Sequence, residues 1–257
     1  VGAALATAVV LAIRGGRWSK WVALAAQTVV LIAAASVANQ TGTAPTPLSD
    51  SLGGLFPLVG LRVEAVSGTM GAAVALVTLL VMVFSLAYMK GEKPRYWAAL
   101  SLFSGSMMGL VYAGDLLHLF VFWELVGAGS YLLIGFWTTK PAAGPAALKA
   151  FLINRVGDVG LMAALLVFLS GVDAPQVLAF GLLVAAFAKS AQFPLHVWLP
   201  DAMAGPTTVS ALLHAATMVA AGVYALVQSA PLLTDEARTT ALVVGSVTAL
   251  LAACAAL

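Results

Sequence analysis

The sequence predicts an all-α, polytopic transmembrane helical bundle, and three observations support this fold class. First, 62% of the 257 residues are hydrophobic and only 9% are charged, whereas soluble domains carry about 25% charged residues. Second, apolar runs long enough to cross a hydrocarbon core of about 30 Å recur along the whole chain. Third, basic residues gather in alternate connections between these runs, as they do in multi-pass membrane proteins.

The apolar runs define the helices in order. Two runs separated by RGGRWSK come first, and the Pro- and Thr-rich stretch 39–51 that follows is typical of a loop. The third run ends at the charged segment KGEKPR, and later runs are divided by polar, Gly- or Pro-containing connections. Nine helices are therefore predicted, at 1–13, 21–38, 63–89, 97–113, 116–137, 147–170, 176–193, 207–229 and 239–257.

The charges in the connections predict the orientation. One side carries Arg14, Arg17, Lys20, Lys90, Lys93, Arg95, Lys140 and Lys149. The other side is net acidic and carries Asp50, Arg62, Asp115, Asp173, Asp235, Glu236 and Arg238. Because short cytoplasmic loops are enriched in Lys and Arg, the first side is expected to be cytoplasmic.

Five ionisable residues remain inside the predicted helices: Glu124, Arg155, Asp158, Lys189 and His214. At a rise of 1.5 Å per residue, Glu124 is expected about 12 Å and Lys189 about 20 Å from the outer edge of the membrane. Ionisable groups at this depth are costly, and they often mark ion or proton pathways. Four different helices thus carry titratable groups at similar height.

Structural and functional interpretations of these residues both remain open. Arg155 and Asp158, three positions apart on one helix, suit a structural ion pair. Glu124 and Lys189 lie on separate helices, which favours a proton relay, because burial lowers the pKa of an amine and a nearby carboxylate raises it. His214 can exchange a proton near neutral pH or simply hydrogen-bond a neighbouring helix.

A proline-rich segment follows Lys189. It contains Pro194, Pro200 and Pro206. Proline interrupts a regular helix, and broken helices at membrane depth line cavities or binding sites. The sequence therefore predicts a discontinuous helix next to Lys189. His196 and Trp198, farther along this segment, are expected at the cytoplasmic membrane interface, where amphipathic rings are common.

Other chemistries fit the sequence poorly. The net charge of +2 and the lack of a basic run interleaved with aromatic residues argue against nucleic acid as a partner. Three histidines without ligand spacing argue against a metal site, and no Gly-rich phosphate loop or dinucleotide fingerprint is present. No cofactor is expected in this chain. Cys254, in an Ala- and Leu-rich run, is expected to be a buried free thiol.

Four motifs carry a resemblance to a known family: GLRVEAVSGTM, FVFWELVGAGSYLLIGFW, ALKAFLINRVGDVGLM and AKSAQFPLHVWLPDAMAGPTTVSALLHAATMVAAGVY. In this order and spacing they closely resemble the antiporter-like membrane subunits of bacterial respiratory complex I, the proton-pumping NADH:quinone oxidoreductase. The resemblance is greatest to the largest of these, the NuoL-like type. It extends from about Gly60 to Leu226, whereas the first two helices match only in general character.

The resemblance implies a proton relay with Glu124, Lys189, His214 and Asp158, in which Arg155 is the partner of Asp158. The family fold has two inverted five-helix repeats, of which this chain would contain the first. Residues 1–96 would then be N-terminal transmembrane helices, 97–230 the proton-translocating module and 231–257 the start of the following helix. Because the chain begins and ends inside apolar runs, we expect it to be part of a longer chain that holds the second repeat.

The resemblance also implies the setting of the chain. It would be a multi-pass subunit of a translocating oxidoreductase in the bacterial inner (plasma) membrane. NADH, FMN, iron–sulfur clusters and quinone would bind to partner subunits, and the chain itself would hold no redox site. Its partners would be other membrane subunits of complex I, including further antiporter-like subunits, and lipid.

Two alternatives come from related proteins. FWEL and AQFPLHVWLPDAM are also similar to the large subunits of Mrp-type Na⁺/H⁺ antiporters, although Ala220 stands where these usually carry a lysine. Membrane hydrogenase and carbon-uptake subunits share the same pattern more distantly. A non-transporting structural subunit is a further interpretation, and Na⁺ in place of H⁺ as the transported ion stays open.

Overall fold

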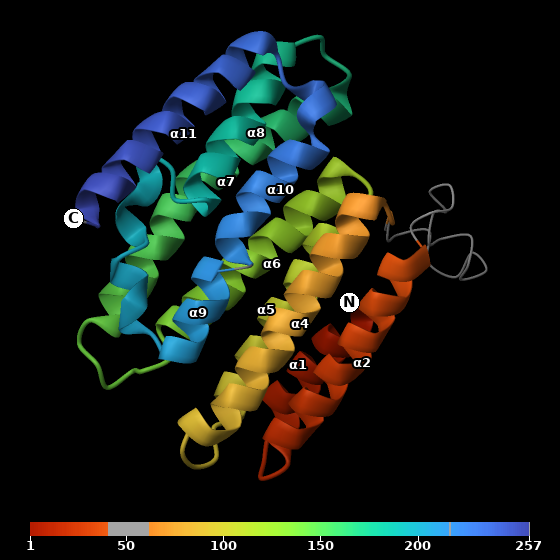
Figure 1. Ribbon diagram of the computed structural model, residues 1–257, viewed down its shortest axis with the longest axis vertical. Helices are drawn as coiled ribbons and strands as arrows, with labels where there is room; N and C mark the ends of the chain where they lie inside the picture. Colours follow the sequence, from red (N-terminus) through yellow and green to blue (C-terminus); the bar gives the residue numbers. More distant parts are fainter. Residues whose placement is uncertain (41–61, 216, 257) are drawn as a thin grey trace.

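The computed structural model describes residues 1–40, 62–215 and 217–256, which form a bundle of helices (Figure 1). The helices are α1 (Gly2–Arg14), α2 (Ser19–Gln40), α4 (Ala65–Tyr88), α5 (Pro94–Val111), α6 (Leu116–Ile134), α7 (Ala143–Ser170), α8 (Pro175–Lys189), α9 (Thr207–Ala215), α10 (Met218–Gln228) and α11 (Asp235–Ala255). Within the described residues, six stretches are long and apolar enough to cross a membrane: α2, α4, α6, α7, α11 and the stretch that contains α9 and α10. The prediction of an all-α, multi-span fold is confirmed.

Each of the nine predicted segments contains helix, and in all but one of them the differences lie at the ends. α5 begins at Pro94 rather than at residue 97, because proline is favoured in the first turn of a helix. α11 begins at Asp235 rather than at residue 239, since the Thr234 side chain accepts a hydrogen bond from the Ala237 backbone N–H and caps the helix. The predicted loop 39–51 lies almost entirely outside the described residues.

The prediction of one continuous helix over 207–229 was wrong. α9 ends at Ala215 and α10 begins at Met218. The Thr217 hydroxyl donates a hydrogen bond to the Leu212 carbonyl oxygen at 2.5 Å. Hydroxyl groups of this kind satisfy carbonyls that an interrupted helix leaves free in a membrane.

α5 is the most enclosed of the helices. Its residues from Tyr96 to Val111 are all buried except Leu102, as expected for a helix that is packed on all sides. α11 lies on the outside of the bundle (Figure 1), and of its residues only Ala237 is buried. Cys254 on α11 is exposed, so the prediction that its thiol is buried was wrong. An apolar run does not reveal whether its helix is central or peripheral.

Glycines bring α7 and α8 into close contact. A Cβ atom at Gly157 would lie 2.4 Å from the Ala188 Cβ atom, and one at Gly181 would lie 2.4 Å from the Gly160 carbonyl oxygen. Small residues at such positions allow helix backbones to approach closely within a membrane. This contact holds the end of α8, where Lys189 lies, against the middle of α7.

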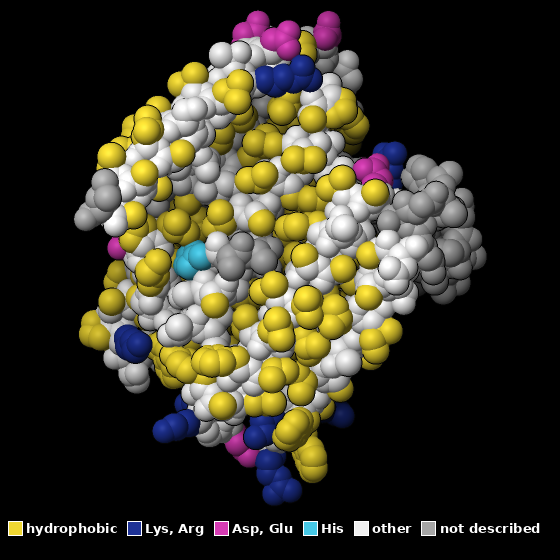
Figure 2. Space-filling view, viewed as in Figure 1, with side chains coloured by type: hydrophobic (Ala, Val, Ile, Leu, Met, Phe, Trp, Pro, Cys, Tyr) yellow, Lys and Arg dark blue, Asp and Glu magenta, His cyan; other side chains and the backbone are white. Residues whose placement is uncertain are grey.

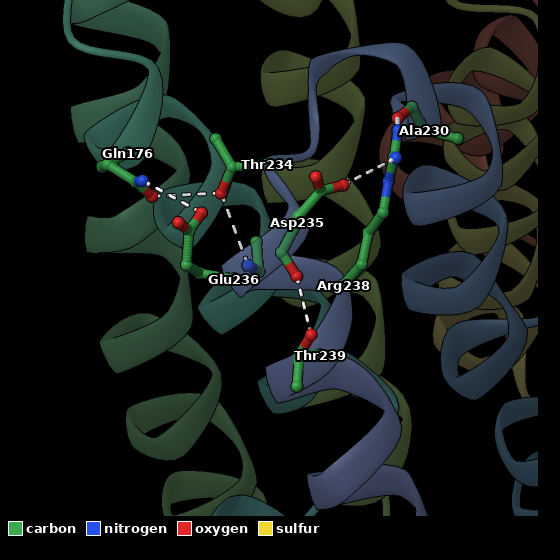
Figure 3. Close-up of polar contacts among 8 residues, drawn as sticks. Gln176, Ala230, Thr234, Asp235, Glu236, Arg238 and Thr239 are labelled. Carbon is green, nitrogen blue, oxygen red and sulfur yellow. Dashed lines mark hydrogen bonds and ion pairs between the residues drawn. The ribbon is translucent and has the colours of Figure 1, made fainter.

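A polar network fixes the other end of α8 to the start of α11 (Figure 3). The Gln176 side chain donates to Glu236 at 3.1 Å and accepts from Thr234 at 3.0 Å. Arg238 donates to the Ala230 carbonyl oxygen at 3.0 Å and pairs with Asp235 at 3.2 Å. These contacts set the position of the outer helix α11 relative to α8.

Charged side chains gather mainly at the two ends of the bundle, with hydrophobic side chains between them (Figure 2). The α1–α2 and α4–α5 connections lie at the same end, as the charge pattern predicts (Figure 1). Much of the dark blue of lysine and arginine in Figure 2 is at that end. This arrangement is what a helical bundle that crosses a membrane requires.

Candidate functional site

The predicted discontinuity next to Lys189 is present, and a specific backbone motif produces it. The Gln192 N–H bonds the Phe187 carbonyl oxygen at 2.8 Å, and the Ala191 N–H bonds that of Ala188 at 3.3 Å. Ala191 has a φ of 50°. These are the features of a Schellman motif, in which the residue after the helix adopts the left-handed conformation. The helix therefore ends at Lys189, several residues before Pro194.

Two short 3₁₀ helices continue the chain after this break, over Leu195–Trp198 and Asp201–Ala204. The Trp198 side chain is fully buried, and its Nε1–H donates to the Ala188 carbonyl oxygen at 3.0 Å. The position of Trp198 at the membrane interface stays a prediction, but its ring is enclosed by protein. A buried indole N–H needs a hydrogen-bond acceptor. For Trp198 this acceptor is the carbonyl oxygen near the end of α8.

Lys189 is completely buried. Its Nζ atom donates to the Trp123 carbonyl oxygen at 3.2 Å and lies 5.3 Å from the centroid of the Trp123 ring. A Cβ atom at Gly127 would lie only 3.1 Å from Nζ, so the absent side chain there leaves room for the amine. α6 thus forms a cradle of backbone and aromatic ring around the end of the lysine.

Trp123 also contacts α7. Its Nε1–H donates to Asp158 Oδ1 at 2.7 Å, so one residue contacts both the lysine and the aspartate. Sequence reasoning missed Trp123. The signal was available, because an indole N–H at membrane depth needs an acceptor and Trp123 directly precedes Glu124.

Arg155 connects the two carboxylates. Its Nη1 atom forms an ion pair with Glu124 Oε2 and lies 3.8 Å from Asp158 Oδ2. Its guanidinium carbon lies 4.7 Å from the centroid of the Phe151 ring. The predicted Arg155–Asp158 pair is present, but Glu124 is the closer partner. The described residues show no direct ion pair between Glu124 and Lys189, since Glu124 is engaged by Arg155.

The four charged side chains form one cluster from three helices. Two acids, Glu124 and Asp158, stand against two bases, Arg155 and Lys189, so their formal charges cancel when all are ionised. The side chain of Asp158 is 7% exposed, whereas those of Glu124 and Arg155 are 20% and 39% exposed. The cluster therefore extends from the buried Lys189 to the partly exposed ion pair of Arg155 and Glu124.

His214 lies apart from this cluster, on α9. Its ring is tilted against that of Trp198, with centroids 6.2 Å apart. Both ring nitrogens are buried, and neither has a hydrogen-bond partner among the residues that the structure describes. The break between α9 and α10 follows directly after His214. Of the five predicted site residues, Glu124, Arg155 and Asp158 are thus in contact. Lys189 is joined to them through Trp123, and His214 contacts Trp198.

The described residues contain no group of three or more His, Cys, Asp or Glu side chains that could hold a metal ion.

Comparison with known proteins identifies two segments. Residues 113–257 match the family described as NADH:quinone oxidoreductase/Mrp antiporter, TM. Residues 51–97 match that described as NADH-Ubiquinone oxidoreductase (complex I), chain 5 N-terminus. The first match includes all five predicted site residues and the break after Lys189.

Similar sequences carry the same type of name. The NAD(P)H-quinone oxidoreductase subunit 5 of the Paulinella chromatophora chromatophore is 43% identical, over 86% of this chain and 38% of its own length. The chloroplastic subunit 5 of Zygnema circumcarinatum is 45% identical, over 79% of this chain and 33% of its own. The chain thus spans about a third of the length of these relatives.

Solved structures share the fold. A chain of the Mrp complex from Dietzia sp. DQ12-45-1b superposes with a TM-score of 0.70 at 28% identity, over 91% of this chain and 28% of that one. A chain of an archaeal membrane-bound sulfane sulfur reductase superposes with a TM-score of 0.74 at 22% identity, over 91% and 52%. The match over residues 113–257, more than half of the chain, shows that the chain belongs to the NADH:quinone oxidoreductase/Mrp antiporter transmembrane family.

Proposed function

We propose that this chain is part of the antiporter-like membrane subunit of an NADH:quinone oxidoreductase and carries protons through Glu124, Asp158, Lys189 and His214, with Arg155 as the charged partner of the two carboxylates. The observation that carries the proposal is the complete burial of Lys189 beside a broken helix, with its Nζ atom on Trp123. An amine held in this way at membrane depth is rarely only structural. The 43–45% identity to relatives named as quinone oxidoreductase subunits supports the same conclusion.

Arg155 gives the relay a means of switching. It pairs with Glu124 and lies 3.8 Å from Asp158, so a small shift exchanges one carboxylate for the other. When Arg155 turns to Asp158, Glu124 loses its counter-charge. The electrostatic environment of Lys189 then changes, because the charges of both Glu124 and Asp158 act on its amine. The proposed consequence is the uptake or release of a proton by Lys189.

His214 is the proposed next carrier. Its two ring nitrogens have no partner among the described residues, so both are available to a water or a proton. Trp198 donates to the Ala188 carbonyl oxygen near the end of α8, and its ring lies 6.2 Å from that of His214 near the end of α9. Irregular backbone at membrane depth is tolerated where it lines a cavity or is buried in protein, which supports a hydrated connection here.

The surroundings of the chain are also part of the proposal. Residues 97–230 would form the translocating module, preceded by the helices of 1–96 and followed by the start of the next helix at 231–257. Together they would contain the first of two inverted repeats. The partly exposed Arg155 and Glu124 support coverage by further protein, either the rest of the full-length chain or another membrane subunit, because lipid would not tolerate them. Redox groups would belong to partner subunits, and the basic end would face the cytoplasm of a bacterium.

A Mrp-type Na⁺/H⁺ antiporter subunit is the second candidate. The likeness to a chain of the Dietzia Mrp complex, at 28% identity and a TM-score of 0.70, favours it specifically. The same cluster would then exchange Na⁺ for H⁺ without any redox partner.

Inverted membrane vesicles that contain the full-length protein in its complex separate the two candidates. We expect NADH to drive acidification of the vesicle interior in sodium-free buffer, and a protonophore to abolish it. A pH-sensitive dye measures both. If NADH has no effect and acidity changes only when a Na⁺ gradient is imposed, the antiporter function replaces the proposed one.

A further inference from the structure

A second charged region lies far from the proposed relay, at the basic end of the bundle. A cavity of about 530 Å³ opens there between the α1–α2 connection and the α4–α5 connection. Its lining includes Arg17, Lys20, Lys90, Lys93, Trp18 and Trp21. Glu92 is the one acidic residue in the lining, so four positive charges stand against one negative charge. The cavity therefore suits an anion.

The basic residues of the cavity are not neutralised by the protein. Among the described residues, Lys149, Arg155 and Arg238 each form an ion pair. The four basic side chains in the cavity form no ion pair and no side-chain hydrogen bond within the part of the chain that the structure describes. Their contacts with rings are those of Arg17, 5.9 Å from the centroid of Trp18, and Lys20, 5.5 Å from that of Trp21.

The backbone around the cavity brings these residues together. Gly91 has a φ of 78°, a conformation that glycine adopts without a steric penalty. The turn that it allows places Lys90 and Lys93 in the same cavity lining. The opposite wall comes from the start of α2 and the residues before it. Two connections that are about 70 residues apart in the sequence thus build one basic site.

The remaining lining indicates which anion the site takes. Trp18 and Trp21 are 66% and 50% exposed, and exposed tryptophans beside basic residues are typical of the level of the lipid head groups. Apolar residues Leu86, Ala87 and Met89 continue the lining. A ligand with a phosphate next to an apolar body matches both parts. Basic pockets between helices on the cytoplasmic side bind phospholipid head groups in this way.

We propose that this cavity binds the phosphate of an anionic phospholipid in the cytoplasmic leaflet, with Arg17, Lys20, Lys90 and Lys93 as its ligands. The apolar part of the lipid lies along Leu86, Ala87 and the two exposed tryptophans. This site is separate from the relay and does not depend on which ion the protein carries.

Lipid titration of the full-length protein in its complex tests the proposal. Phosphatidylglycerol is added to the delipidated, detergent-solubilised complex, and bound lipid is counted by native mass spectrometry. We expect the double variant Lys20→Gln/Lys90→Gln to weaken binding at this site at least about tenfold. The control, Arg14→Gln/Lys140→Gln, removes two charges from the same end outside the cavity lining and is expected to bind as the wild type does.

Four results would overturn the proposal. Equal weakening in both double variants would mean diffuse attraction by surface charge. Unchanged binding in Lys20→Gln/Lys90→Gln would mean that the cavity is not the site. Equal affinity for phosphatidylcholine, or competition by inorganic phosphate at similar concentration, would mean that an anionic lipid is not the ligand. Native mass spectra also report whether each variant is still assembled.

Discussion

Replacement of Lys189 by methionine is expected to lower NADH-driven proton uptake severalfold while the complex still assembles. Methionine has a similar length and fills the cradle formed by Trp123 and Gly127. The change leaves one excess carboxylate in the cluster, and a proton can neutralise it, so the fold has no need to expel a charge. What is lost is the only amine among the four charged groups, and with it the proposed step between the cluster and His214.

Lys149→Met is the matched control. Lys149 lies on α7, is 42% exposed and pairs with Asp201 at 2.6 Å. An exposed pair of this kind contributes about 0–1 kcal/mol, so proton uptake should match the wild type. Both variants are measured as acidification of inverted vesicles per NADH oxidised, with the amount of complex determined on a native gel. Normal uptake by assembled Lys189→Met would remove Lys189 from the pathway.

Gly157→Ala is expected to give the largest loss of stability. Alanine normally stabilises a helix relative to glycine by about 0.5–1 kcal/mol. At this position, however, its Cβ atom would lie 2.4 Å from that of Ala188 and 3.2 Å from the Ala185 Cα atom. Overpacking of a close contact costs about 1–3 kcal/mol, and here the contact joins α7 to α8. The thermal midpoint and the yield of assembled complex should both fall.

Gly144→Ala, on the same helix, is the control for helix propensity. A Cβ atom there meets nothing within 4 Å, so its stability should equal or exceed that of the wild type. Thermal unfolding of the solubilised complex, followed by light scattering, measures both variants. If Gly157→Ala is as stable as Gly144→Ala, the contact between α7 and α8 at Gly157 is not tight. It would then not hold the end of α8, where Lys189 lies, in place.

The fold was largely predictable because hydropathy and charge report directly on membrane spans. The positions of most helices, the gathering of basic connections at one end and the discontinuity next to Lys189 follow from long apolar runs, alternate basic connections and three prolines. The point at which α8 ends was not predictable in this way. A Schellman motif usually has glycine in the left-handed position, and Ala191 gives no such signal.

The partners within the site were harder to predict than its members. The four charged residues of the cluster stand out by their type and their depth. Sequence spacing, however, predicted that Arg155 pairs with Asp158 and that Glu124 pairs with Lys189. The order in space depends on how α6 and α7 pack against their neighbours: Gly129 lies against Phe103 of α5, and Gly157 lies against Ala188 of α8. The break after Ala215 carries no proline or glycine at all, so no local signal marks it.

The central claim is that the cluster around Glu124 and Lys189 conducts protons, and Glu124→Gln tests it most directly. Glutamine keeps the size of the side chain and an oxygen for Arg155, yet it removes the charge that holds Arg155 away from Asp158. NADH-driven acidification is measured in inverted vesicles that contain equal amounts of wild-type or variant complex. We predict a severalfold slower acidification in the variant. Equal acidification in both would contradict the relay and leave Glu124 with a structural role alone.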